Sequence, residues 1–199
     1  MSEGTDVGTR TDTRTKMLAS AIALLRERGA AAVTVDAVLT HSRSPRGSVY
    51  HHFPGGRAEL MAQALGLAGD GLSGVVEQLA ASDPRTALHR FGELWAAALR
   101  DSDFRAGCPI VSAAVGGSPD DEPLRSATAA IFDRWHDALG SVLVDAGVDA
   151  DRAARLATMT VAAIEGAVVL CRSQRSTGPL DDVVAELDVL LSTAVPARS

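Results

Sequence analysis

The chain has 199 residues, 46% of them hydrophobic, so it is long enough to bury a sizeable core in one or two domains. Its two cysteines form no disulfide framework, its histidines lack metal-ligand spacing and it has no long apolar run, which predicts a cytoplasmic protein without metal, cofactor or membrane partner. The net charge of −6 is uneven: residues 1–60 hold eight basic and six acidic side chains, a mildly basic head typical of DNA-binding proteins that carry an acidic sensor domain.

The first predicted elements are an arm and two helices. Residues 1–11 are polar and lack periodicity, which predicts a disordered arm; a minor-groove arm is the alternative, but this segment carries a single arginine. A helix follows from residue 12, with apolar residues spaced as on one helical face, and Gly29 ends it. Thr34 is the expected N-cap of a second, shorter helix.

Residues 44–57, SPRGSVYHHFPGGR, have the composition of a surface helix that meets a partner. Ser44 and Pro45 predict the cap and first turn of this helix, and Pro54 ends it. Arginine, tyrosine and histidine side chains are poor material for a core and suit contact with phosphates and base edges. Thr34 and Arg57 stand at helix N-termini, where backbone N–H groups favour phosphate.

Residues 34–60 resemble the helix-turn-helix of TetR/AcrR-type repressors, whose reading helix carries Tyr-x-x-Phe and then a basic residue, as Tyr50, Phe53 and Arg57 do here. Within that family the run resembles the LmrA/YxaF subgroup, as does the downstream signature Gly107-Cys108-Pro109-Ile110. The turn departs from the family, because Ser42-Arg43-Ser44 replaces Ala-Gly-Val. The family glycine favours positive φ, so either Arg43 accepts about 1 kcal/mol of strain or the turn differs in detail.

No strand-like alternation occurs, so the sequence predicts an all-α fold. The resemblance implies a three-helix DNA-binding head over residues 12–60 and a ligand-binding and dimerisation body over residues 61–199. In the head, Arg46 is expected to meet a guanine edge or a phosphate, and Gly47 to let the helix approach closely. The expected DNA contacts are Thr34, Arg43, Ser44, Pro45, Arg46, Gly47, Ser48, Tyr50, His51 and Arg57.

The predicted body consists of long helices. The first runs from residue 57 to about residue 81 and is interrupted by Gly66, Gly69, Gly71 and Gly74, which form either a flexible joint or sites of close helix packing. Further helix starts are expected near Pro84, Pro123, Asp149 and Pro179.

Aromatic side chains concentrate in the body, which predicts an apolar pocket, with an ordinary core as the alternative. The resemblance implies an inducer site there. For Cys108 a packed wall position is favoured over a redox thiol, because no basic residue stands beside it in sequence. The expected ligand-binding residues are Phe91, Trp95, Phe104, Cys108, Phe132 and Trp135.

Small residues between Ala157 and Leu170 permit close approach of another helix. Because a single reading helix rarely binds tightly alone, we expect a homodimer, against the alternative that these residues fill a monomer core. The expected interface residues are Ala163, Gly166, Ala167, Leu170, Val184, Leu187 and Leu191.

Together these features predict a transcriptional regulator, a repressor that a small apolar or aromatic effector releases from double-stranded operator DNA. A rival hypothesis is an enzyme that uses Cys108 or Ser118 with a histidine, but no Gly-x-Ser-x-Gly, P-loop or dinucleotide motif supports it. A third hypothesis is a dimeric DNA-binding protein whose pocket is vestigial.

Overall fold

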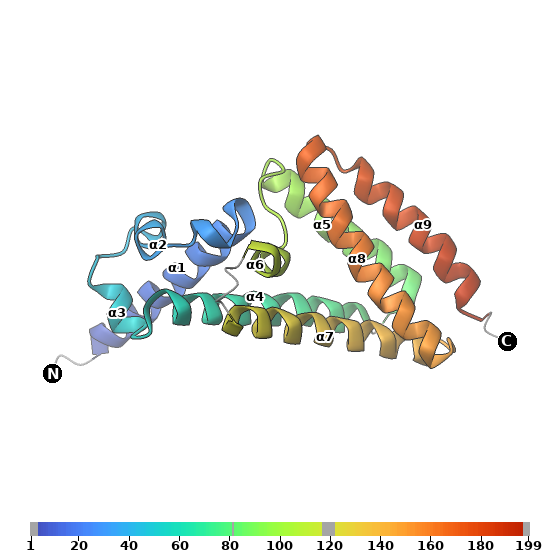
Figure 1. Cartoon of the computed structure of the whole chain (residues 1–199), viewed down its shortest axis with the longest axis horizontal. Helices are drawn as coiled ribbons and strands as arrows, with labels where there is room; N and C mark the ends of the chain where they lie inside the picture. The colour runs from blue at the N-terminus through green and yellow to red at the C-terminus, as the bar shows by residue number, and fades with distance from the viewer. Residues whose placement is uncertain (1–3, 81, 117–121, 197–199) are drawn as a thin grey trace. The chain divides into compact units, whose positions relative to one another are not determined.

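The computed structural model describes residues 4–80, 82–116 and 122–196, with side chains from residue 12 onward except 79 and 80. The described residues form helices and no strand, which confirms the all-α prediction (Figure 1). In chain order the elements are α1 (Gly4–Arg28), the 3₁₀-helix η1 (Ala30–Ala32), α2 (Val35–Ser42), α3 (Ser48–His52), α4 (Gly56–Ala80), α5 (Pro84–Asp101), α6 (Pro109–Gly116), α7 (Glu122–Asp145), α8 (Ala150–Gln174) and α9 (Gly178–Ala194).

The chain divides into two compact units. The head unit consists of Met1–Gly69 and Pro109–Thr128, and the body unit consists of Asp70–Cys108 and Ala129–Ser199. This division differs from the sequence expectation, which assigned everything after residue 60 to the body. The reason is α6, a short apolar helix whose buried side chains pack against α1 and η1.

Helix α1 begins earlier than the sequence indicates. It starts at Gly4, so residues 4–11 are helical where a disordered arm is expected, while residues 1–3 lie outside the described part. A short polar segment rarely forms a helix by itself, because helix nucleation is unfavourable. Extending a helix that already exists avoids this cost. The nucleus is the amphipathic half of α1, where Met17, Ala21 and Leu25 are fully buried.

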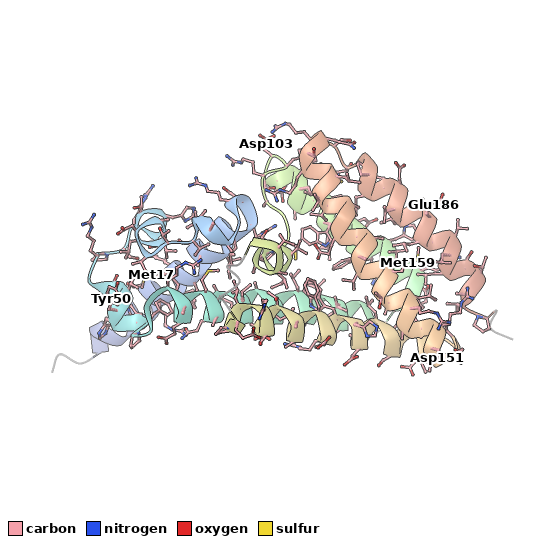
Figure 2. The ribbon with its side chains drawn as sticks, viewed as in Figure 1. Met17, Tyr50, Asp103, Asp151, Met159 and Glu186 are labelled. Atoms are coloured by element: carbon pink, nitrogen blue, oxygen red, sulfur yellow. The ribbon has the colours of Figure 1, made fainter. Side chains whose placement is uncertain are left out.

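The core of the head unit holds α3 in place. Val49 and Phe53, one turn apart, are fully buried, and the guanidinium of Arg14 on α1 lies 5.7 Å from the centre of the Phe53 ring. Tyr50, which follows Val49 in the helix, is by contrast 63% exposed (Figure 2). The short helix therefore presents a fixed outer face, although it has too few residues to be stable by itself.

The body unit is built mainly from α5, α8 and α9, which contact one another. The helix starts follow the sequence signals: Asp83 caps α5 ahead of Pro84, and Asp149 caps α8. Helix α7 is joined to α4 by polar contacts, since the indole N–H of Trp135 donates to Ser73 Oγ at 3.1 Å. The cores of both units are thus closed by residues far apart in sequence.

Candidate functional site

The turn between α2 and α3 is the left-handed turn that the sequence leaves open. Arg43 has φ 55° and ψ 36°, and the N–H groups of Arg43 and Ser44 donate to the carbonyls of Thr40 and Leu39 at the end of α2. The residue at this position of the hydrogen-bond pattern is usually glycine, because the left-handed region costs other residues about 1 kcal/mol of conformational energy. Arg43 accepts that strain, and its side chain is exposed.

Helix α3 starts after Gly47, whereas the sequence predicts a start at Pro45 with Ser44 as the cap. The carbonyl of Pro45 accepts both the N–H and the hydroxyl of Ser48, at 3.0 and 2.6 Å. These bonds close a tight turn before the helix, so α-helical bonding begins only at Ser48. The hydroxyl of Ser44, which does not cap α3, accepts a hydrogen bond from Ser42 Oγ at 2.9 Å.

The outer face of α3 and the turn before it gather the predicted DNA-contacting side chains. Arg43, Arg46, Tyr50 and His51 are all exposed, while the intervening Val49 is buried. A Cβ built on Gly47 would meet no atom of the chain within 4 Å, and its φ of −76° suits any residue. Internal packing therefore does not require glycine at this position.

Thr34 and Arg57, predicted as phosphate contacts, occupy different environments. Thr34 is exposed and caps α2, with its hydroxyl accepting the N–H of Ala37 at 3.1 Å. The guanidinium of Arg57 turns inward: its Nε donates to the carbonyl of Val33 at 2.7 Å, and one terminal nitrogen donates to that of Ala30 at 2.9 Å. Arg57 thus ties the start of α4 to the segment before α2, a structural role that the sequence does not indicate.

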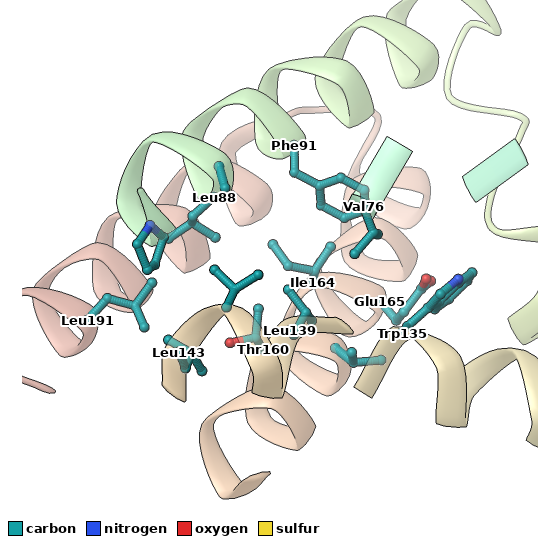
Figure 3. A pocket seen from close by; sticks show the side chains of 14 residues that line it. Val76, Leu88, Phe91, Trp135, Leu139, Leu143, Thr160, Ile164, Glu165 and Leu191 are labelled. Atoms are coloured by element: carbon teal, nitrogen blue, oxygen red, sulfur yellow. The ribbon is translucent and has the colours of Figure 1, made fainter. Parts of the chain in front are cut away.

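A cavity of about 820 Å³, counting its open mouth, lies within the body unit (Figure 3). Its walls are mostly aliphatic, as expected of a site for an apolar molecule. Side chains from α4, α5, α7, α8 and α9 line it: Val76, Pro84, Ala87, Leu88, Phe91, Trp135, Leu139, Val142, Leu143, Thr160, Val161, Ile164, Glu165 and Leu191.

Of the aromatic residues expected in the pocket, Phe91 and Trp135 line the cavity. Trp95 and Phe132 stand edge-on to those two rings, at 6.5 and 5.3 Å between ring centres, and are not part of the lining. Phe104 lies beyond the end of α5 with φ 58°, and its N–H donates to the carbonyl of Leu99 at 2.7 Å. The concentration of aromatic residues in the sequence correctly indicates the apolar region, but their spacing in the sequence does not show which rings line the cavity.

Glu165 on α8 is the residue that sequence reasoning missed. Among the described residues that line the cavity, it alone is ionisable. Burial raises the pKa of its carboxyl to about 7, and a hydrogen bond from the Cys108 side chain opposes this rise. Its Oε2 is buried without a hydrogen-bond partner. The signal available in the sequence was a single acidic residue among the mostly small and aliphatic residues 156–171.

The packing of the segment Gly107-Cys108-Pro109 explains why these three residue types occur there. A Cβ on Gly107 would lie 2.9 Å from a guanidinium nitrogen of Arg172, so glycine lets the chain pass close to α8. Cys108 is 3% exposed and contacts Glu165 behind the cavity wall, and Pro109 begins α6. Cys108 is thus a packed residue beside the site; Ser118, the other candidate nucleophile, lies outside the described residues.

The residues expected at a dimer interface fall into two groups. Ala167, Val184, Leu187 and Leu191 are buried within the chain, and Leu191 lines the cavity, so these residues are not available to a partner. By contrast, Gly166 and Leu170 are exposed, and Ala163 is half-buried. The apolar face of α9 serves the body core, because α9 packs against both α5 and α8. Other large apolar side chains are exposed on these helices, namely Met159, Val169 and Val189.

Comparison with known proteins agrees with this arrangement. Residues 17–64 match the family described as bacterial regulatory proteins, tetR family, and residues 84–186 match the LmrA/YxaF-like C-terminal domain of transcriptional regulators. An HTH-type transcriptional regulator of Mycobacterium tuberculosis is 40% identical, over 94% of this chain and 97% of that protein. YxaF of Bacillus subtilis is 28% identical, over 92% and 96% of the two chains.

Solved structures show the same fold. The regulatory protein TetR from Rhodobacter sphaeroides superposes with a TM-score of 0.79 at 22% identity, covering 88% of this chain and 96% of that one. A TetR transcriptional regulator from Chloroflexus aurantiacus gives 0.77 at 22% identity, covering 94% and 98%. The chain therefore belongs to the TetR family of DNA-binding transcriptional regulators, with a C-terminal domain of the LmrA/YxaF-like kind.

Proposed function

We propose that this protein is a cytoplasmic repressor that binds operator DNA as a homodimer and is released when a small apolar effector enters the cavity of the body unit. The observation that carries the proposal is the pairing of an exposed reading helix with an apolar cavity in one chain. Helix α4 belongs to both parts: it begins beside α3 in the head unit, and its Val76 lines the cavity.

In the head, Arg46 reads a base edge, while Tyr50, His51 and Thr34 hold the phosphates. All four side chains are exposed, and α3, which carries Tyr50 and His51, is anchored by Val49 and Phe53, which supports these roles. Ser44, Pro45 and Ser48 shape the turn ahead of the helix. Gly47 supports close approach, because the space above it is open and a methyl group there would meet the DNA rather than the chain.

The homodimer forms through the exposed apolar stripe of α8, consisting of Met159, Ala163, Gly166 and Leu170, with Val189 on α9. These α8 residues lie three or four apart, so they share one helix face. By length and hydropathy alone α8 would also suit a membrane span, with a mean hydropathy of 1.6 over its most apolar window. A partner helix on this stripe accounts for the same exposed apolar surface in a cytoplasmic regulator.

Effector release depends on differential affinity, since a ligand that binds both states of the protein equally shifts nothing. We place the coupling in α4. Gly66, Gly71 and Gly74 lie in that helix, and a Cβ on any of them would meet no atom of the chain within 4 Å. Close packing within the chain therefore does not require these glycines, which favours the joint interpretation over the packing one.

The test is binding of the purified full-length protein to a duplex from its own promoter, with a random duplex as the control, measured by fluorescence anisotropy. We expect preference for a near-palindrome with half-sites about 34–36 Å apart, and affinity that falls steeply with salt. Apolar compounds that raise the melting temperature should lower that affinity about 5- to 150-fold. Equal affinity for both duplexes at moderate salt would contradict the proposal, as would turnover of a bound compound.

A further inference from the structure

The cavity is polar at one place. Figure 3 shows Glu165 and Trp135 at one end of the cavity, with Leu88, Leu143 and Leu191 at the other. The only other polar side chain of the described lining is Thr160. A molecule that fills this space therefore meets a long apolar wall and a carboxyl group at one end.

The carboxyl group lacks the partner that a buried acid needs. One interaction comes from the Cys108 side chain, and a thiol is a weak donor, while Oε2 has no hydrogen bond at all. Cys108 is the ionisable group that affects the pKa of Glu165, and the cavity residues of α4, α5, α7 and α9 that surround the space are uncharged. A buried carboxylate in such surroundings is unfavourable unless a cation or strong donor meets it.

The end of the cavity that holds Glu165 also offers an aromatic ring. Trp135 lines the wall there, and its indole N–H is already used by Ser73, which fixes the ring in position. Tryptophan faces attract organic cations, and a protonated amine supplies both a charge and several N–H donors. A carboxylate ligand would be repelled at this end, and a neutral alcohol would leave the charge uncompensated.

We propose that the effector is a lipophilic amine, whose protonated nitrogen pairs with Glu165 while its apolar body lies between Leu88, Leu143 and Leu191. This inference rests on the proposed function, because it names the chemical class that the same cavity takes. Glu165 is the specificity-determining residue, since the rest of the wall distinguishes ligands mainly by size and shape.

The experiment uses three matched probes, 4-phenylbutylamine, 4-phenylbutan-1-ol and 4-phenylbutyrate, with binding to the full-length protein measured by calorimetry. The amine should bind about tenfold or more tightly than the alcohol, and the acid most weakly. Glu165→Gln should remove the preference for the amine. Glu186→Gln, the same chemical change on the exposed side of α9, is the control and should keep it. Melting curves verify that both variants are folded.

The pH dependence gives an independent readout. With the pKa of Glu165 near 7, amine binding must displace a proton below that pH, so its affinity should rise from pH 6 to pH 8 and then level off. The alcohol should show no such rise, nor should the amine with Glu165→Gln. Equal binding of amine and alcohol to the wild type, or unchanged amine binding to Glu165→Gln, would overturn the inference.

The two proposals can fail separately. If the amine binds through Glu165 but leaves the operator complex intact, release through this cavity is wrong and the ligand class stands. If an apolar compound releases DNA equally from the wild type and from Glu165→Gln, the repressor proposal stands and the amine is overturned.

Discussion

The proposed DNA-reading face and the cavity place their residues by opposite means; this face consists of the exposed side chains of Arg43, Arg46, Tyr50 and His51. On the reading face, the residues that matter lie within one short stretch, and bonds between near neighbours fix the turn, as between Ser48 and Pro45. In the cavity, Val76, Phe91, Trp135, Glu165 and Leu191 come from different helices. A local site is specified by a sequence motif. A cavity depends on how several helices pack, because its lining consists of the side chains that border the space left between them.

The largest expected effect separates the core of the body unit from its surface. Leu187→Glu places a charge at a position that is 3% exposed, so it should lower the free energy of unfolding by about 3–5 kcal/mol. Leu170→Glu, at 50% exposure, should leave folding almost unchanged and break the dimer instead. Chemical denaturation and sedimentation measure the two effects. A folded, dimeric Leu170→Glu protein would move the interface away from the α8 stripe.

The next prediction concerns the polar end of the cavity. Because burial raises the pKa of Glu165 in the folded protein from its ordinary value of 4.5 to about 7, the folded protein holds this proton more tightly than the unfolded chain. Stability should therefore be greatest at acid pH, as far as this group is concerned, and fall by up to about 3 kcal/mol as pH rises through 7.

Glu165→Gln removes the titrating group, so its melting temperature should fall less than that of the wild type between pH 5 and pH 7.5. Parallel melting curves across this range would show that water reaches the carboxyl group and relieves the effect of burial.

A third prediction separates two arginines of the head. Arg46→Ala should weaken specific DNA binding by about 1–3 kcal/mol and relax sequence preference, without changing the melting temperature. Arg57→Lys should lower the stability of the protein and leave the sequence preference of DNA binding unchanged. One ammonium group does not reproduce the two hydrogen bonds to the carbonyls of Val33 and Ala30, so the expected loss of stability is about 1 kcal/mol. Fluorescence anisotropy and melting curves measure DNA affinity and stability for both variants. If the two variants lose the same affinity and the same stability, the two arginines do not have separate roles.

A smaller effect is expected at the proposed joint in α4. Gly71→Ala adds a methyl group into open space, so it should stabilise the helix by up to about 1 kcal/mol. If the glycines lower the cost of repositioning the helix, the same variant should need more effector to release DNA. A stabilised variant with an unchanged release curve would assign the coupling elsewhere.

The smallest expected effect is at the turn. Arg43→Gly relieves the left-handed strain but makes the unfolded chain more flexible, so the net change in stability should stay within about 0.5 kcal/mol. Any loss of DNA affinity then reports the guanidinium itself, measured against Arg46→Ala. Wild-type affinity would show that Arg43 serves the turn alone.

The sequence predicts well those features of this chain that depend only on residues close together in sequence. Thr34 caps α2 as expected, and Asp83 and Asp149 cap helices at the starts that the sequence predicts, because a cap needs only the next turn. For Arg43 the motif offered two alternatives, a strained left-handed residue or a different turn, and the structure shows the first of them.

The rest depended on long-range packing. The apolar face of α9 has the pattern of an interface, yet it packs within the body unit, and helical periodicity does not distinguish a partner's surface from the chain's own core. The inward bonds of Arg57 join residues more than twenty positions apart, so no local pattern reveals them. Glu165 was hidden for a related reason: which side of α8 borders the cavity is set by the other helices around it.

The segment after α5 has a mechanical consequence. Cys108, whose side chain contacts Glu165, is joined by a single peptide bond to Pro109, the first residue of α6 in the head unit. The peptide bond is planar and the proline ring fixes the φ of Pro109, so few backbone rotations are free at this connection. If a ligand that pairs with the Glu165 carboxyl group also shifts Cys108, we expect the shift to reach α6 through this short connection, in addition to the proposed route through α4.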